Sequence, residues 1–390
     1  MRNLLLLIAL LHLFGVVKAQ KITHDNVMFI DTHNDVLSKQ ILNGADLSIN
    51  QPALNFDLPK ANKGNLGAQV FSIWCDEIYS NGKAFARANQ EIDSLLAFVQ
   101  RNADKVTFVT NSKQLKKAIK KKRFAAMIGV EGGHMIEDRM DYLDSLIKRG
   151  LKYLTLTWNN STSWATSARD EETKKDSLPH LGLTDMGRKV VARLNEAGVM
   201  VDVSHVGEQT FKDVMETSAK PVIASHSCAW ALSPHRRNLK DSQLIAIANS
   251  GGVVFVNFYS EFLDSNFAAK RNAFFAIHKS EMDSLTKLSG DPNQAIADIF
   301  ALYPAQTDSM RPPLSLLVKH IDYIAKLVGT DHVGVGADYD GAESFPVQMD
   351  DVSRYPLLVT ELRNLGYSKS DIEKIAHGNF IRVLKANETK

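Results

Sequence analysis

Histidine and carboxylate side chains follow several apolar runs of this chain, at the points where those runs end. One such run, residues 27–31, is followed by His33 and Asp35, which are two residues apart and would point to the same side of an extended backbone, about 7 Å apart. The same pattern recurs at four later runs, which end in or lead into Glu131, His205, His226 and Asp338. Three imidazoles and three carboxylates are therefore candidates for one shared site.

Divalent metal ions are the chemistry that best accounts for such a set. Three carboxylates and three imidazoles gathered without a counter-ion would repel one another or be costly to desolvate. Two divalent cations would remove that cost, and imidazole and carboxylate ligands suit zinc, while manganese, cobalt and iron stay open. The sequence thus predicts a metal-dependent hydrolase.

Each candidate residue also has a structural explanation when taken alone. A histidine at a strand end is commonly a hydrogen-bonded core residue, Asp35 could cap a helix, and Asp338 could belong to the turn before Gly341. These explanations would have to coincide at five strand ends, which favours a shared site. Other chemistries lack their motifs: no Gly-x-Ser-x-Gly is present, and Gly132-Gly133 is not followed by the Lys-Ser/Thr of a phosphate loop.

Eight apolar runs of strand length must position these residues. Their continuous apolar character is typical of parallel strands buried on both faces, and helical periodicity fills the gaps between them. Eight such alternations predict an α/β fold, a (β/α)8 TIM barrel, in which all strand ends converge on one face; an open doubly wound sheet is the alternative. The runs are 27–31, 68–74, 124–130, 153–158, 200–204, 222–225, 253–257 and 332–337.

The chain is expected to divide into a short leader and one domain. Residues 1–19 combine a basic start, an apolar run and small residues before Gln20, which predicts a signal peptide and export to the periplasm or medium; an uncleaved anchor is the alternative. Residues 20–390 then form one barrel domain, with an insertion on the active-site face at 260–313 and closing helices at 351–388. No transmembrane span is expected in the mature chain.

The charge and the cysteine content bear on nucleic-acid binding and on disulfide formation. Without the leader, which holds Arg2 and Lys18, the basic and acidic residues balance, so no basic field would attract nucleic acid. The two cysteines, Cys75 and Cys228, could form one disulfide in an exported chain or remain as two buried thiols.

Several longer motifs resemble those of the membrane (renal) dipeptidases, a branch of the amidohydrolase superfamily. The resemblance spans about residues 27–384 and rests on segments that surround the candidate ligands. They are Asp31-Thr32-His33-Asn34-Asp35, Gly129-Val130-Glu131-Gly132-Gly133-His134, Tyr153-Leu154-Thr155-Leu156-Thr157, Asp202-Val203-Ser204-His205, Pro221-Val222-Ile223-Ala224-Ser225-His226-Ser227, Arg236-Arg237-Asn238 and Gly336-Ala337-Asp338-Tyr339-Asp340-Gly341.

This resemblance implies a role for each residue. His33 and Asp35 would hold one zinc ion, His205 and His226 a second, and Glu131 would bridge them. Asp338 would carry the proton, and Arg237 would bind the terminal carboxylate of the substrate. The implied protein is an exported, zinc-dependent dipeptidase and a homodimer, which cuts dipeptides by a metal-bridged hydroxide, including those with a C-terminal D-residue.

Two departures from the family pattern bear on the substrate. Mammalian members carry a histidine that polarises the scissile carbonyl where this chain has Trp158, so Asn159 or Asn160 is expected to contact the substrate instead. Members also place a tyrosine near the substrate, for which this chain offers Tyr259 and then Phe262. The missing lipid-anchor tail suggests a bacterial relative. Another binuclear amidohydrolase, acting on a lactam or an N-acyl amino acid, and a non-catalytic binding protein are the alternatives.

Overall fold

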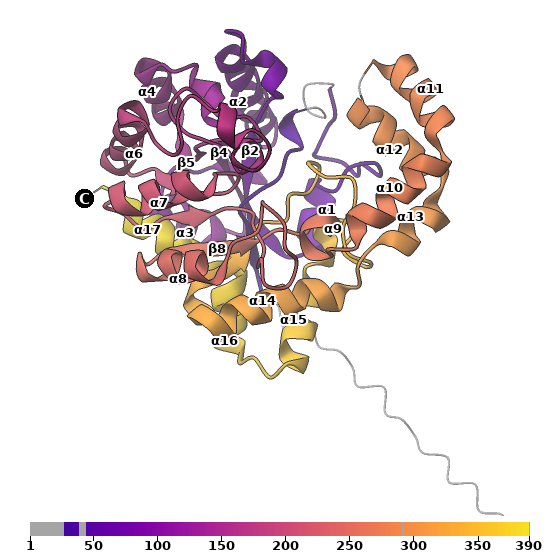
Figure 1. Ribbon diagram of the computed structural model, residues 1–390. Coiled ribbons are helices and arrows are strands. Elements are labelled where there is room, and N and C mark those ends of the chain that lie inside the picture. The colour runs from indigo at the N-terminus through magenta and orange to yellow at the C-terminus, as the bar shows by residue number, and fades with distance from the viewer. Residues whose placement is uncertain (1–26, 39–43, 291, 390) are drawn as a thin grey trace, which may run out of the picture.

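The computed structural model describes residues 27–38, 44–290 and 292–389 (Figure 1). The leader expected at residues 1–19 lies outside these ranges. Among the described residues no helix has the length and apolar character needed to cross a membrane.

Eight parallel strands form the ring at the centre of the molecule, in the order β1-β2-β4-β5-β6-β7-β8-β9. Each coincides with one of the eight expected runs, so the predicted (β/α)8 barrel is confirmed. Their bounds are Phe29–Asp31 for β1, Leu66–Ile73 for β2, Phe124–Glu131 for β4, Leu151–Thr155 for β5, Met200–Asp202 for β6, Ile223–Ala224 for β7, Val253–Val256 for β8 and Val333–Val335 for β9.

The barrel closes where its first strand meets its last. The amide of Thr32 donates to the carbonyl of Val335 over 3.2 Å, and the amide of Asp338 donates to the carbonyl of His33 over 3.2 Å. A further parallel bridge joins Asn34 to Tyr339. The seam of the barrel therefore runs through the segments that carry three of the candidate site residues.

One strand was missing from the sequence prediction. β3, Val106–Phe108, pairs in parallel with β4 outside the ring order. It is only three residues long and its side chains are mostly half-buried. Its residues Val106 and Phe108 alternate with Lys105 and Thr107, so they do not form the continuous apolar run by which the ring strands are recognised.

The barrel is wrapped by amphipathic helices. In α2, Ala88, Ile92 and Leu95 are spaced to share one face and are fully buried, and α6 ends at Gly198, whose φ of +70° suits glycine. Helical periodicity in the sequence predicts six of these helices within two residues of their observed ends, over 86–101, 140–148, 184–197, 209–218, 241–248 and 314–327. The wrapping helices are α1 Leu58–Lys63, α2 Ala84–Arg101, α3 Ser112–Lys120, α4 Met140–Lys148, α5 Ala168–Thr173, α6 Asp185–Ala197, α7 Glu208–Thr217, α8 Asp241–Asn249 and α14 Leu314–Val328.

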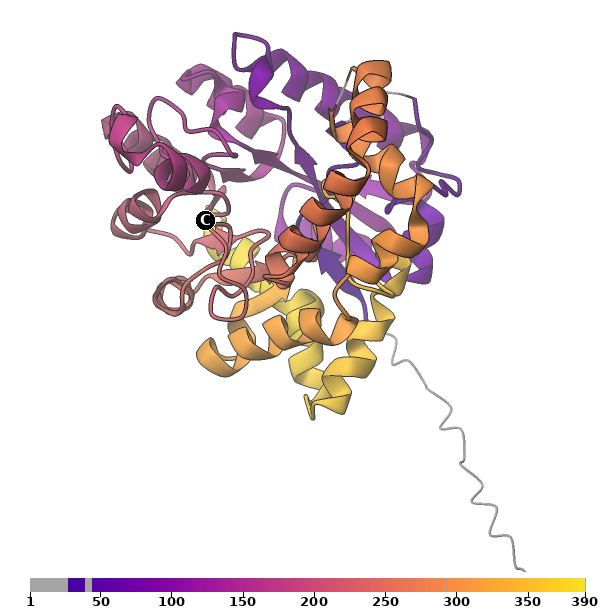
Figure 2. The same ribbon diagram turned by 45° about the vertical axis from the view of Figure 1, so that its right-hand side comes forward.

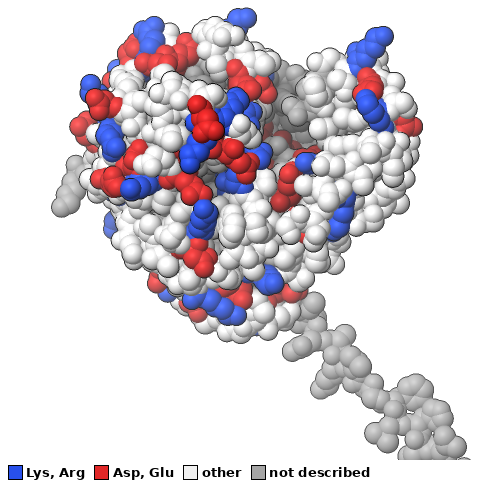
Figure 3. Space-filling model, viewed as in Figure 1, with Lys and Arg blue, Asp and Glu red and all other residues white. Residues whose placement is uncertain are grey.

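Two further groups of helices complete the chain. Residues 260–313 form α9 Ser260–Leu263, α10 Phe267–Ile277, α11 Lys279–Ser289, α12 Pro292–Leu302 and α13 Pro304–Met310, an arm with its own small core that stands beside the barrel (Figures 1 and 2). After β9 the chain forms α15 Pro356–Asn364, α16 Lys369–Glu373 and α17 Asn379–Asn387. Phe380, Val383 and Leu384 of α17 pack against the side chains inside the barrel. The surface is hollowed between the barrel and the arm (Figure 3).

Candidate metal centre

The ends of five barrel strands bring the six predicted ligand and proton-carrying residues together. Glu131 lies at the centre of this group. Its Oε1 is 2.9 Å from Nε2 of His205 and 3.3 Å from Nε2 of His226, whereas its Oε2 is 3.4 Å from Nε2 of His33. The two oxygens of one carboxylate thus face different imidazoles.

A second set of contacts surrounds His33. Its Nε2 is 3.4 Å from Asp35 Oδ2 and 3.9 Å from Asp338 Oδ1. Two overlapping groups have ligand atoms within 4.8 Å of one another, and His205 joins neither, although it contacts Glu131. The groups are His33, Glu131 and His226, and His33, Asp35 and Asp338.

Hydrogen bonds at Nδ1 fix the ring orientation of two of the histidines. Tyr153 Oη donates to the carbonyl of Thr32 over 2.9 Å, so it can only accept, over 2.9 Å, from Nδ1 of His33. A proton on Nδ1 leaves Nε2 of His33 free to act as a ligand toward the cluster. Gly129 makes this contact possible, since a Cβ there would lie 2.1 Å from the ring of Tyr153.

His226 is held in the same manner. Ser225 Oγ donates to Asp202 Oδ2 over 2.5 Å and therefore accepts, over 2.8 Å, from Nδ1 of His226. Its Nε2 is then also a free ligand atom. Asp202 in turn accepts from the backbone amides of Ser204 and Ser225, which ties the loops after β6 and β7 to one carboxylate.

Two of the six residues have left-handed backbone conformations, which set the direction of their side chains. His205 has a φ of +66° and Asp338 a φ of +64°, in a region that residues with a Cβ rarely adopt. Backbone of this kind commonly occurs at functional sites, where the surrounding structure holds it in place.

The electrostatics of the cluster favour added positive charge. Burial alone would raise the pKa of Glu131, but the neighbouring histidines outweigh it and hold that pKa well below its usual range. Burial chiefly lowers the pKa of His205 to about 3. Burial would also lower the pKa of His33, yet Tyr153 and the carboxylates Asp35 and Glu131 raise it well above normal.

The residues present fit divalent cations. Several buried polar atoms of the described residues have no hydrogen-bond partner, and three of them face the cluster: Nε2 of His33, Oδ1 of Asp35 and Nε2 of His226. Buried polar atoms without partners are costly, and all three belong to residues with metal-ligating side chains directed into one cluster. Nitrogen and oxygen donors of this kind suit zinc and neighbouring transition metals.

Asp338 lies between this cluster and a cavity of about 510 Å³. Its Oδ1 approaches His33, and its Oδ2 accepts from Nδ2 of Asn257 over 2.8 Å. Burial, together with the charges of Asp35 and Glu131, raises the pKa of Asp338 well above its usual value. A carboxyl group with a raised pKa can take up and release a proton near neutral pH.

Two of the predicted substrate-binding residues, Asn159 and Tyr259, line this cavity but differ in their hydrogen bonds. Asn159 lines the same cavity as Asp338, and its carbonyl accepts from Oγ of Ser167 over 2.6 Å. Tyr259 also lines that cavity, but its hydroxyl is already bound to Glu343 over 2.7 Å and to Arg271. The structure therefore brings the ring of Tyr259 to the cavity, with its hydroxyl engaged in an ionic network.

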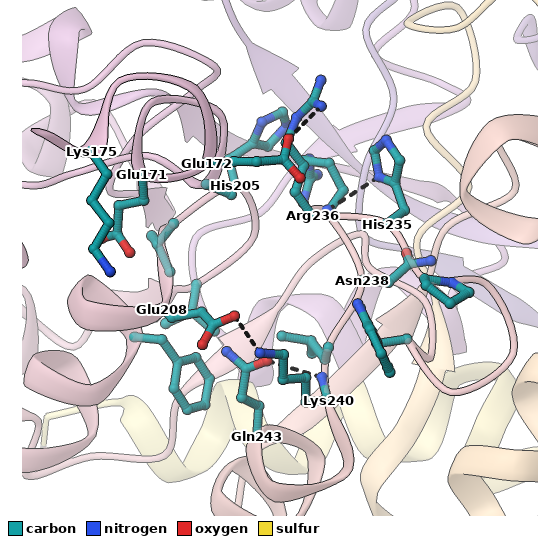
Figure 4. A pocket seen from close by; sticks show the side chains of 18 residues that line it. Glu171, Glu172, Lys175, His205, Glu208, His235, Arg236, Asn238, Lys240 and Gln243 are labelled. Atoms are coloured by element: carbon teal, nitrogen blue, oxygen red, sulfur yellow. Dashed lines mark hydrogen bonds and ion pairs between the residues drawn. The ribbon is translucent and has the colours of Figure 1, made fainter. Parts of the chain in front are cut away.

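A neighbouring cavity has a volume of about 530 Å³ (Figure 4). Arg237 lines this cavity, and His205 lines both cavities. The Arg237 guanidinium is buried, and its Nη2 donates to the carbonyl of His226 over 3.3 Å. Burial lowers its pKa to about 10, so it remains a cation at neutral pH. Arg236, by contrast, pairs with Glu172 over 3.0 Å near the mouth of that cavity.

Comparison with known families identifies the chain. The family model of the membrane dipeptidases, peptidase family M19, matches residues 17–390. The chain belongs to the membrane dipeptidase family. It is accordingly a metal-dependent dipeptidase with an amidohydrolase-type barrel.

Solved structures share this fold. One is dipeptidase AC, a metallopeptidase of family M19, with 24% identity, a TM-score of 0.76 and coverage of 93% of this chain and 99% of that one. The probable dipeptidase PvdM from Pseudomonas aeruginosa has the same identity and TM-score and covers 93% and 96%. A metallopeptidase from Rhodobacter sphaeroides, liganded with a phosphinate mimic of the dipeptide L-Ala-D-Ala, has 23% identity, a TM-score of 0.74 and coverage of 93% and 100%.

Sequence analysis of this membrane dipeptidase family member missed residues that support its site. Asn257 and Asp202 lie at strand ends, where the rule that found the ligands would also have found them. Tyr153 and Trp74 gave no such signal, because an aromatic residue in a strand is ordinarily a core residue.

Proposed function

We propose that this membrane dipeptidase family member is an exported enzyme that uses two zinc ions to hydrolyse free dipeptides, including those with a C-terminal D-residue. His33 and Asp35 would hold one ion, His205 and His226 the other, and Glu131 both. This assignment rests on the position of the Glu131 carboxylate between the histidines. Its Oε2 faces His33, and its Oε1 faces His205 and His226.

The chain's own residues supply proton transfer and binding. Cations held in this cluster would activate water and polarise an amide carbonyl. Asp338, held by Asn257 and with a raised pKa, accepts a proton as water adds and passes it to the leaving amine. Arg237 receives the terminal carboxylate; its buried Nε has no hydrogen-bond partner among the described residues.

Three further features of the proposal rest on sequence or on relatives. Acceptance of a C-terminal D-residue is suggested by the ligand of the Rhodobacter sphaeroides structure, which mimics L-Ala-D-Ala. Export is suggested by the leader pattern of residues 1–19, and N-terminal sequencing of the mature protein should then begin at Gln20. A homodimer is expected from the family resemblance and is checked by light scattering.

The decisive experiment is hydrolysis of matched L-Xaa-L-Yaa and L-Xaa-D-Yaa dipeptides, with chelator and after zinc is restored. We expect cleavage that chelator abolishes and zinc restores, and little cleavage of dipeptides amidated at the C-terminus. The Arg237→Met variant should lose roughly a hundredfold in kcat/KM on free dipeptides, and Arg236→Met serves as its matched control. A fully metallated protein that cleaves lactams or N-acyl amino acids but no dipeptide would contradict the proposal.

A further inference from the structure

We infer that Trp74 and Trp158 form the subsite for the side chain of the substrate's N-terminal residue, and that this subsite selects aromatic and large apolar residues. The inference rests on the proposed dipeptidase function and deepens it. Trp158 directly follows the segment Tyr153-Leu154-Thr155-Leu156-Thr157, and Trp74 directly follows β2.

The two indoles form one aromatic wall beside the metal centre. Trp74 follows β2 and Trp158 follows β5, and their ring centroids are 5.0 Å apart with an interplanar angle of 63°. Both are half-buried and line the cavity that contains Glu131 and Asp338. The ring of Trp158 is 6.4 Å from that of His205, so the wall begins directly beside the cluster.

The backbone around this wall is well supported. The amide of Trp74 donates to Oε2 of the buried Glu91 over 2.9 Å. On the other side, a Cβ at Gly132 would lie 3.3 Å from Cβ of Trp158, which shows how closely that loop packs against the indole. Large contact surfaces held in fixed positions discriminate between substrate side chains.

The two cavities show which end of a dipeptide meets the wall. Arg237 lines the neighbouring cavity, whereas Trp74 and Trp158 line the cavity that contains Glu131 and Asp338. His205 lines both cavities, so the cluster lies where they meet. A dipeptide with its carboxylate at Arg237 and its amide bond at the cluster therefore extends its N-terminal residue into the cavity of Trp74 and Trp158.

The charge of the cavity disfavours substrates with an acidic N-terminal residue. Among the described residues, its lining includes six carboxylates and no lysine or arginine. Two of the six, Asp35 and Glu131, are proposed metal ligands, and the other four favour the substrate's ammonium group and disfavour an acidic side chain. Apolar surface from the arm, Ile296 and Ala297, also lines the cavity. The carboxylates are those of Asp35, Asp76, Glu131, Asp338, Asp340 and Glu343.

Hydrolysis of Phe-Ala, Ala-Ala and Asp-Ala by the zinc-loaded full chain tests the inference. We expect kcat/KM for Phe-Ala to exceed that for Ala-Ala by roughly tenfold, with Asp-Ala slowest. Trp158→Ala and Trp74→Ala should each bring the ratio of Phe-Ala to Ala-Ala close to one. Trp230→Ala is the matched control, because that indole lines the neighbouring cavity instead and should leave the ratio unchanged.

Conservative variants and a binding measurement separate the possible failures. Trp158→Phe should keep most of the preference and Trp158→His should lose it, with thermal stability and metal content as checks on folding. Calorimetric binding of phosphinate mimics of Phe-Ala and Ala-Ala needs no turnover. A Trp-dependent binding preference without hydrolysis would support the subsite and refute the dipeptidase proposal. Equal binding of both mimics by the wild type, or a preference that survives both alanine variants, would overturn the subsite.

Discussion

Two histidines of the proposed metal centre are oriented by groups that do not face the cavity. Tyr153 holds Nδ1 of His33, and Ser225 with Asp202 behind it holds Nδ1 of His226, so that each Nε2 is directed into the cluster. Such hydrogen bonds fix the tautomer of a metal ligand and raise its basicity.

The contact between Tyr153 and His33 can be removed with little change of shape. In Tyr153→Phe the ring still fills the space left by Gly129, but Nδ1 of His33 loses its acceptor. We expect zinc affinity to fall roughly 10- to 100-fold, as measured by competition with a chromogenic chelator. Tyr323→Phe is the control, since that hydroxyl binds Asp241 on the outer helices. Equal affinities in both variants would contradict this role.

Asp338 gives a second prediction for a single residue. Asp338→Asn keeps the hydrogen-bonding shape but cannot carry a proton, so kcat should fall by roughly 10² to 10⁴ while KM changes little. Metal content should be retained. Asp340→Asn, the same change at a buried carboxyl two residues away, is expected to cost far less. A large drop in metal content of Asp338→Asn would reassign Asp338 as a ligand.

The candidate ligands could be predicted from sequence because they follow recognisable strands. Their supporting partners could not, since Tyr153 reaches His33 across the barrel, 120 residues away. Tyr259 was predicted near the substrate, and its hydroxyl binds Glu343, 84 residues away, a contact that the sequence does not indicate. The burial of Arg237 and its opening into a second cavity likewise depend on how the surrounding loops pack.

At the scale of elements, α2 is joined to the end of β2 by a buried acid. Glu91 of α2 accepts from the amide of Trp74, and its Oε1 is 3.5 Å from Nε of Arg87. Burial is the main cause of a pKa for Glu91 well above the usual value of 4.5. The folded protein therefore holds this proton more tightly than the unfolded chain does.

This coupling predicts how stability depends on pH. A raised pKa contributes stability that is complete below the unfolded value of 4.5 and is lost as pH rises through the folded pKa. Glu91→Gln still accepts from Trp74 but cannot ionise, so its free energy of unfolding should decline less than that of wild type as the pH rises above 4.5. Urea unfolding across this range measures the difference, with the exposed Glu216→Gln as control. Parallel curves for wild type and Glu91→Gln would contradict it.

The positions of the strands were predicted more fully than the backbone conformation of the loops that follow them. All eight ring strands overlap continuous apolar runs, whereas the apolar residues of β3 are separated by Thr107. The left-handed backbone at His205 and Asp338 gave no signal, because neither residue is a glycine. These two conformations depend on the loops around them rather than on local sequence preference.

At the scale of the whole molecule, the structure distinguishes between a disulfide and two free thiols. The sequence left open one disulfide or two thiols, and the structure contains Cys75 and Cys228 as free, buried thiols. Burial raises the pKa of Cys75 to about 12 and that of Cys228 higher still. Neither thiol is thus a reactive thiolate at neutral pH.

The native protein should therefore resist thiol reagents. We expect negligible labelling of the folded enzyme, labelling of both cysteines after unfolding, and a Tm that reductant does not change. Labelling with an aromatic disulfide reagent, with and without denaturant, gives the measurement. A Tm that falls on reduction would show that the two cysteines are paired.

The seam of the barrel has a consequence for how the enzyme is made. Asp31 accepts from the amide of Ala337 across 306 residues of chain, beside the bond between His33 and Asp338. His33 and Asp35 of the proposed site are thus synthesised early and Asp338 almost last, so a nascent chain cannot assemble the whole site. Contacts this distant in sequence also form late in folding. A prematurely terminated or clipped chain would be inert rather than partly active, and the cell would gain a peptidase only once the molecule is finished.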